Sequence, residues 1–295
     1  MSKEFDLKKV CFLCGEPLAS SQELNLEHIF PEWILKKYEK VRLFNNSLGF
    51  ERQKQKFYSH KLEVHADCNS AFGRLVETPI SKGQFDEKLL WIWCLKIIVG
   101  LQFYEYGFDL VRSRPGEEVN DTLDQYPDDA NTFWALAPQL LSHGEFTNTA
   151  IYSVIEIDYL FEEPNFYYHI HYELSIVWIT FGARSFVVFY RSFLGEEKTE
   201  LYKNYWTQID TEAKQNGEFL PPQVRYNIFC ARIAIDHYFA SSGWSFDFSQ
   251  KDNHLTPTRP ARTPEIEDSF YEFFGLKPIR QSGKIVEWKM IPSDS

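Results

Sequence analysis

Two short pairs of metal-binding side chains lie near the start of the chain. Cys11 and Cys14 form the first pair, and His65 and Cys68 repeat the same spacing of two intervening residues. A structural zinc ion takes four ligands in a tetrahedron, and it prefers thiolates and imidazoles. The sequence therefore predicts a zinc ion held by Cys11, Cys14, His65 and Cys68, with His60 as the alternative to His65.

The cysteine usage of the whole chain agrees with metal binding. There are five cysteines, and the polar start of the chain does not resemble a secretory signal. We therefore expect a reducing, cytoplasmic compartment, where paired cysteines more often bind metals or act in redox chemistry than form disulfides. The thioredoxin-like pattern typical of a redox pair is absent around Cys11. Cys94 and Cys230 lie in apolar helical patterns and are predicted to be core residues.

Further polar residues lie between and beside the two pairs. The run Glu27-His28-Ile29-Phe30-Pro31 separates them, and Asn69 directly follows Cys68. An acidic residue and a histidine before an apolar pair and a proline, then a Cys-Asn step that opens a helix, resemble the HNH endonuclease family. The resemblance covers about residues 9–80. It implies a zinc-stabilised ββα-metal (HNH-like) module that hydrolyses phosphodiester bonds of nucleic acid.

The resemblance also implies a role for each residue. Glu27 and Asn69 would hold a Mg²⁺ or Mn²⁺ ion, and His28 would be the general base, for which an imidazole is suited near neutral pH. The middle asparagine of the family would be Asn46 or, less favoured, Asn45. On a regular strand, however, His28 would face the opposite side from Glu27 unless the strand is twisted or bulged.

The distribution of charge keeps nucleic acid open as a partner. The whole chain has a net charge of -11, but residues 1–80 hold 12 basic and 11 acidic residues. Binding to phosphates depends on the local patch, so the whole-chain value does not exclude it. We expect double-stranded DNA as the partner, contacted by Lys54, Lys56 and Arg74. The alternative is that the basic stretch is an ordinary solvated face.

Two other function classes compete with the endonuclease. Glu27 and His28 could be a solvated pair at a strand end, with Asn69 a helix cap. The chain would then be a non-catalytic, zinc-stabilised module that binds nucleic acid or protein. In the third class, the chemistry lies in the carboxyl half around His169 and His171, which share one face of a predicted strand.

The rest of the chain supplies the elements that must support the site. The most apolar run, 89–108, is as long as a membrane span but contains Lys96, which favours a buried or interfacial helix. A Pro- and Gly-containing stretch at 113–129 suggests a linker. The further elements expected are strands at 150–160, 165–181 and 185–193, with a hairpin turn at Gly182-Ala183-Arg184, and a helix at 224–238.

These elements predict an α+β protein of two domains. Residues 1–80 would form the HNH-like nuclease domain, and 81–295 a larger α+β domain with an antiparallel sheet. The larger domain would be accessory or regulatory, serving as a dimerisation surface, a sensor or a docking site for a partner. This layout is similar to that of bacterial or phage defence effectors, an analogy of arrangement alone.

Overall fold

The computed structural model gives the fold of most of the chain. Masked segments separate the parts that it describes, which are residues 10–19, 21–38, 40–45, 50–52, 60–112, 127–145, 152–157, 165–172, 174–215, 220, 222–241, 245–249, 254–258, 263–274, 276–282 and 284–290.

The chain divides into two compact units, Met1–Phe193 and Leu194–Ser295. The sequence placed a domain boundary after residue 80, but one hydrophobic core continues across that position. Phe12 and Val64, from the predicted nuclease domain, belong to the same buried cluster as Trp93 and Tyr168. The first 80 residues therefore share their core with the residues that follow.

The first unit begins with a hairpin and a helix. Strand β1 (Leu24–His28) pairs antiparallel with β4 (Lys61–His65), and helix α3 (Ala66–Phe72) follows β4 without a break. A π-helical turn, η2 (Gly73–Glu77), and a short helix, α4 (Thr78–Ser81), continue from α3. Between the two strands the chain forms three further elements, which are α1 (Glu32–Lys37), β2 (Lys40–Asn45) and β3 (Phe50–Arg52).

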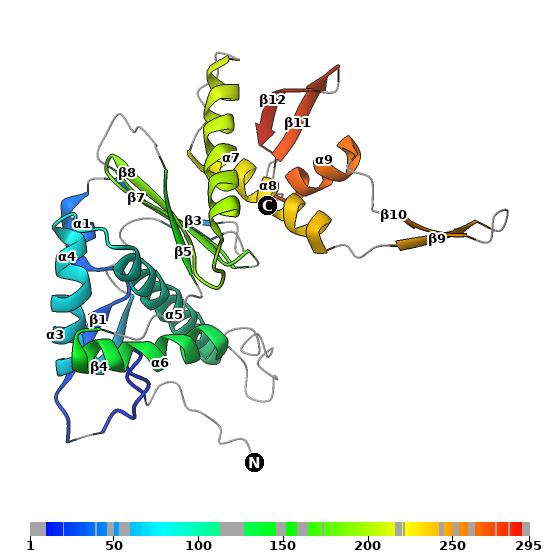
Figure 1. Cartoon of the computed structure of the whole chain (residues 1–295). Coiled ribbons are helices and arrows are strands. Elements are labelled where there is room, and N and C mark those ends of the chain that lie inside the picture. The colour runs from blue at the N-terminus through cyan, green and yellow to red at the C-terminus, as the bar shows by residue number, and fades with distance from the viewer. Residues whose placement is uncertain are drawn as a thin grey trace. The chain divides into compact units, whose positions relative to one another are not determined.

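Helix α5 (Glu87–Arg112) is the centre of the first unit. Every residue from 90 to 102 is buried, which explains why this stretch is apolar on all sides. It contacts β4 and η2 as well as β5 and β8 of the sheet (Figure 1). Helix α6 (Pro127–His143) packs against α5 and α3. Among the described helices, α5 included, none is both long and apolar enough to cross a membrane.

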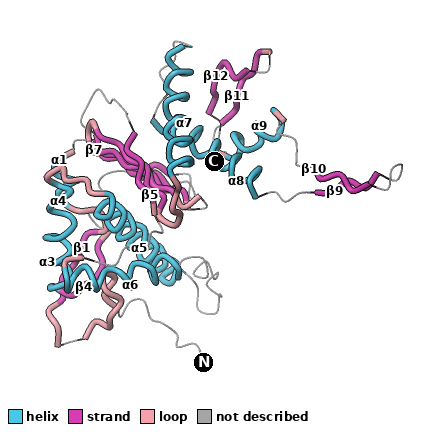
Figure 2. The backbone as a smooth tube through the Cα atoms, viewed as in Figure 1, coloured by secondary structure: helices cyan, strands magenta, loops and turns pink. Residues whose placement is uncertain are grey.

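A six-stranded sheet completes the unit, in the order β3-β2-β6-β7-β8-β5. Two of its strands, β5 and β7, are labelled in Figure 2. Its last four strands are β5 (Ser153–Ile157), β6 (Asn165–His171), β7 (Ile176–Phe181) and β8 (Arg184–Phe189). The pairs β6–β7, β7–β8 and β8–β5 are antiparallel, as predicted. The hairpin at Gly182 is confirmed. The single strand predicted at 165–181 is wrong, because the chain turns at Ser175, which has a positive φ of 54°. Strand β2 adds a parallel pairing with β6 that the sequence did not indicate.

The second unit is mostly helical. Helix α7 (Glu196–Gln215), which the sequence analysis missed, packs on α8 (Pro222–Ser241), and α8 confirms and extends the helix expected at 224–238. Helix α9 (Pro264–Phe273) packs on α8. Two hairpins complete this unit, one of β9 (Ser245–Ser249) and β10 (His254–Thr258), the other of β11 (Leu276–Gln281) and β12 (Lys284–Met290).

Candidate metal centre and the end of strand β1

The four predicted zinc ligands come together. The sulfur atoms of Cys11, Cys14 and Cys68 and a ring nitrogen of His65 all lie within 4.8 Å of one another. Over the described ranges this is the one group of three or more His, Cys, Asp or Glu side chains with such spacing. These residues are therefore close enough to bind a metal ion such as zinc.

The backbone around the first pair forms a tight turn. The amide nitrogens of Cys14 and Gly15 donate to the carbonyl oxygen of Cys11, at 3.2 and 2.8 Å, and the Cys11 nitrogen donates to the Glu16 oxygen at 2.8 Å. Gly15 has a φ of +76°, a conformation that glycine adopts without strain. The ring of Trp134, from α6, covers this glycine, and its Nε1 donates to the Phe12 oxygen at 3.0 Å. The turn therefore depends on a helix that lies beyond residue 80.

His65 is oriented to present Nδ1 to an ion. Its Nε2 lies 3.2 Å from the carbonyl oxygen of Pro17, which can only accept, so Nε2 carries the proton. Nδ1, the other ring nitrogen, lies 3.4 Å from the Cys14 sulfur and 3.8 Å from the Cys68 sulfur. Tetrahedral zinc with ordinary bond lengths would place a sulfur and a nitrogen ligand about 3.6 Å apart. The donor set therefore fits zinc.

His60, the alternative ligand, lies elsewhere. It is buried, with its ring centroid 4.0 Å from that of Tyr104, and it is outside the cysteine group. Its backbone oxygen accepts from the Ile29 nitrogen at 3.0 Å and so extends the β1–β4 ladder. His60 is therefore part of the scaffold of the hairpin.

Ionisation of one of the three thiols disfavours ionisation of the other two. Hydrogen bonds from the Cys14 and Cys68 thiols lower the pKa of Cys11 to about 2. The contact with the ionised Cys11 in turn raises the pKa of Cys14 to about 11, and it also raises that of Cys68. One thiolate alone is therefore favoured at neutral pH in this arrangement. A divalent cation would remove the conflict, because metal binding favours deprotonation of every thiol ligand.

Glu27 lies in a buried ionic cluster. Its Oε1 is 2.6 Å from the Nζ of Lys96, and the same Nζ is 3.0 Å from Oε1 of Glu77. Lys96 is fully buried, and burial by itself would lower its pKa, but the two carboxylates reverse the effect and raise it. Burial raises the pKa of Glu77, opposed by the positive charge of Lys96. One carboxylate oxygen of Glu27, Oε2, is outside these contacts.

The strand register separates Glu27 from its neighbour. His28 lies opposite Lys61 and Glu27 opposite Leu62, so consecutive residues of β1 belong to opposite faces of the hairpin. His28 is only partly buried. Burial, and then the positive charge of Lys61, lower the pKa of its imidazole. His28 is therefore neutral near pH 7, the state that a general base requires.

Asn69 lies within α3, one residue after the zinc-site Cys68. The helix begins at Ala66, three residues earlier than the sequence suggested, and His65 is its N-cap residue. Asn69 is therefore not the helix cap, and its partly buried side chain is available for another role. Carboxylate and amide oxygens, such as those of Glu27 and Asn69, are the donors that Mg²⁺ and Mn²⁺ prefer.

The predicted nucleic-acid contacts are only partly described. Arg74 is in η2 and is exposed, as a phosphate contact would require. Asn45 ends β2 opposite Phe50, and its side chain lies outside the described part of the structure. The predictions for Asn46, Lys54 and Lys56 lie outside the described residues.

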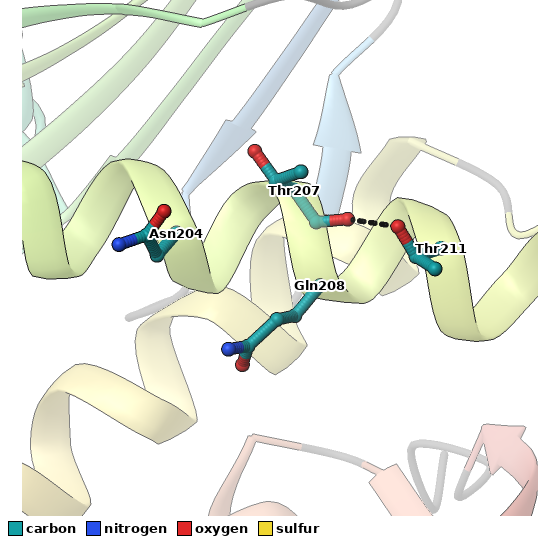
Figure 3. Close-up of a pocket in the computed structure, with 4 residues that line it drawn as sticks. All are labelled: Asn204, Thr207, Gln208 and Thr211. Carbon is teal, nitrogen blue, oxygen red and sulfur yellow. Dashed lines mark hydrogen bonds between the residues drawn. The ribbon is translucent and has the colours of Figure 1, made fainter.

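The carboxyl-side candidates show no comparable chemistry. His169 and His171 are buried in β6, and burial lowers the pKa of His169 well below its ordinary value. Neither belongs to the metal-binding group found in the described part of the chain. Cys94 and Cys230 are buried, as predicted. A pocket on α7 is lined by uncharged side chains, with no cysteine, histidine or carboxylate among them, namely Asn204, Thr207, Gln208 and Thr211 (Figure 3).

Three residues near the candidate site escaped the sequence analysis as site residues. Glu77 and Trp134 carry no motif, and their partners lie far away in the sequence. Lys96 did give a signal, since it is a charged residue inside the most apolar run of the chain. In the sequence, that charge indicates only that the run does not span a membrane.

Comparison with known proteins gives no further guidance. No family model, no curated protein and no solved structure matches the chain. The function is therefore argued from the residues of the site.

Proposed function

We propose that the protein is a metal-dependent endonuclease of the HNH type that hydrolyses phosphodiester bonds of nucleic acid, with DNA the favoured substrate. The observation that carries the proposal is the order of elements around the metal centre. An antiparallel pair of strands runs directly into a helix, with two of the four ligands before this unit and the other two at the junction of β4 and α3. Glu27 and His28 end the first strand, and Asn69 lies in the helix.

The residues offer the chemistry that hydrolysis needs. His28 is neutral at pH 7 and partly accessible, so its imidazole can accept a proton from an attacking water molecule. Oε2 of Glu27 and the amide oxygen of Asn69 would hold a Mg²⁺ or Mn²⁺ ion, which offsets negative charge on the phosphate when bound. Zinc would have a structural role, because four protein ligands leave no open position for a substrate.

The charges near Glu27 support a cation there. Glu27 and Glu77 share the single ammonium group of Lys96, so three charged groups leave one negative charge in excess. A divalent cation would be attracted to that excess charge, and partial burial makes the attraction stronger than in water. Exposed Arg74, next along the chain from α3, would contact a backbone phosphate.

A nicking assay tests the proposal. Supercoiled plasmid and, in parallel, single-stranded DNA and RNA are incubated with the full-length protein and Mg²⁺ or Mn²⁺. We expect cleavage that His28→Ala reduces by a factor of about 100 or more, as for loss of a general base. His143→Ala is the matched control, because His143 is an exposed histidine at the end of α6. Unchanged cleavage by His28→Ala with full zinc content would refute the assignment.

A non-catalytic zinc-stabilised binding module is the second candidate. Two observations favour it. Glu27 and His28 belong to opposite faces of the hairpin, whereas the nuclease needs both at one site. The contact of 2.6 Å between Glu27 and Lys96 also favours it, because a carboxylate that neutralises an ammonium group binds cations less strongly. This candidate predicts nucleic-acid binding that weakens with salt and no cleavage with any divalent metal. An electrophoretic mobility shift assay run beside the nicking assay separates the two functions.

A further inference from the structure

A buried lysine reaches the end of β1 from the middle of α5. Lys96 is fully buried, and its Nζ donates to Glu27 Oε1 at 2.6 Å, His28 O at 2.7 Å, Glu77 Oε1 at 3.0 Å and Ile29 O at 3.2 Å. The ring centroids of Phe12 and Phe72 lie 6.0 and 5.9 Å from Nζ. An ammonium group has three hydrogens, so these four acceptors use all of them.

Stability alone does not account for this arrangement. Taking an ammonium group and its partners out of water is costly, and a well-packed apolar side chain at such a place is often as stable or more stable. What a charged group adds is a defined geometry, because short charge-assisted hydrogen bonds fix the atoms that they join. Here the fixed atoms are one oxygen of Glu27 and the backbone oxygens of the two residues that follow it.

We infer that Lys96 is a positioning residue for the site at the end of β1. It holds Oε1 of Glu27, so that Oε2 is the oxygen presented to a divalent cation, and it fixes the backbone that carries the His28 imidazole. Glu77 has a complementary role. Its carboxylate balances the charge of Lys96, so that Glu27 keeps a net attraction for the cation. This inference rests on the proposed function, which it extends to α5, outside the region of the resemblance.

The two roles predict opposite effects on cation binding. Lys96→Met removes a positive charge beside Glu27, so Mn²⁺ should bind about tenfold more tightly, whereas Glu77→Gln removes a negative charge and should weaken Mn²⁺ binding about tenfold. In Lys96→Met the orientation of Glu27 and His28 is lost, so we expect kcat for plasmid nicking to fall at least tenfold with KM little changed. A lysine remote from any cation site would produce neither shift in Mn²⁺ affinity, and a lysine that acted by its charge alone would leave kcat unchanged.

The experiment uses the full-length, zinc-loaded protein. Mn²⁺ affinity is measured by electron paramagnetic resonance without nucleic acid, zinc content by metal analysis, and kcat and KM by nicking. Lys82→Met, at an exposed position after α4, is the control for loss of a lysine. If Lys96→Met does not fold, Glu77→Gln still tests the charge balance, because weaker Mn²⁺ binding is expected from it alone.

Each result bears on one of the two proposals. Opposite shifts in Mn²⁺ affinity with a loss of kcat support the positioning role. Wild-type nicking with Mn²⁺ affinity and kcat unchanged in Lys96→Met would overturn the positioning role and leave the nuclease proposal standing. Opposite shifts without nicking by the wild type would retain a cation site and overturn the nuclease. Failure of the zinc-loaded wild type to bind Mn²⁺ would overturn the inference.

Discussion

Replacing Gly15 by alanine should damage the metal centre through two separable effects. The first is backbone strain, because Gly15 has a φ of +76°. The second is a clash, because an added Cβ would lie 2.8 Å from two ring atoms of Trp134 and 3.3 Å from its Cβ. Contacts below 3.0 Å require the turn or the indole to move.

The size of each effect can be worked out with a matched glycine. A left-handed conformation costs a non-glycine residue about 1–2 kcal/mol. Overpacking a well-packed region costs about 1–3 kcal/mol. Gly144 has nearly the same φ, +77°, but an added Cβ there meets nothing within 4 Å. Gly144→Ala should therefore show the strain alone, and Gly15→Ala should lower the free energy of unfolding by about 1–3 kcal/mol more than Gly144→Ala.

Urea unfolding of the zinc-loaded protein, followed by circular dichroism, measures both losses. A third comparison isolates the clash, since Gly15→Ala should cost less in a Trp134→Ala background than in the wild type. Metal analysis of the same samples should show weakened zinc retention in Gly15→Ala and unchanged zinc retention in Gly144→Ala. Equal losses of stability in the two glycine variants would refute the proposed contact between the turn and α6.

Three further predictions concern the metal, the fold and pH. Metal analysis should find one zinc ion per chain, and Cys14→Ser should lose it and destabilise the first unit, because the binding energy of a structural zinc is folding energy; a zinc-free wild type of unchanged stability would contradict the ligand set. A fragment of residues 1–193 should fold and bind zinc, whereas 1–80 should not give a cooperative thermal transition, because its core is completed by α5 and α6. Burial lowers the pKa of His169, so the unfolded chain binds the proton more readily, and stability should fall as pH decreases below the unfolded value near 6.5. Urea unfolding at pH 7.5 and 5.5 measures this loss of stability, which His169→Gln should lessen; a loss as large as that of the wild type would count against the assignment.

The sequence predicted local features well where residue types at a characteristic spacing, or a long apolar run, marked them. The spacing of the two ligand pairs was enough to predict the metal group, because few arrangements other than a shared ion account for two such pairs. The apolar run around Trp93 predicted α5, and the Gly182 turn predicted the β7–β8 hairpin. The strand predicted at 165–181 failed because a turn without glycine or proline at Ser175 gives little sequence signal.

Long-range partners were beyond the reach of the sequence. Strand β2 joins β6 in a parallel pair more than 100 residues away, and no local pattern specifies which strand becomes its neighbour. The boundary placed after residue 80 followed the end of the motifs, whereas the hydrophobic core follows the burial of Phe12 and Val64 against α5. Motifs report chemistry, and the limits of a folding unit depend on where apolar surface can be buried.

The amino-acid sequence by itself determined the types of ligand, their spacing and the candidate residues Glu27, His28 and Asn69. Only the tertiary structure decided their surroundings. It placed Nε2 of His65 beside the carbonyl oxygen of Pro17, and it brought the ammonium group of Lys96 into contact with the carboxylate of Glu27. The reason is physical, because ligand type is a property of one side chain, whereas charge balance and protonation depend on groups that folding brings from distant parts of the chain.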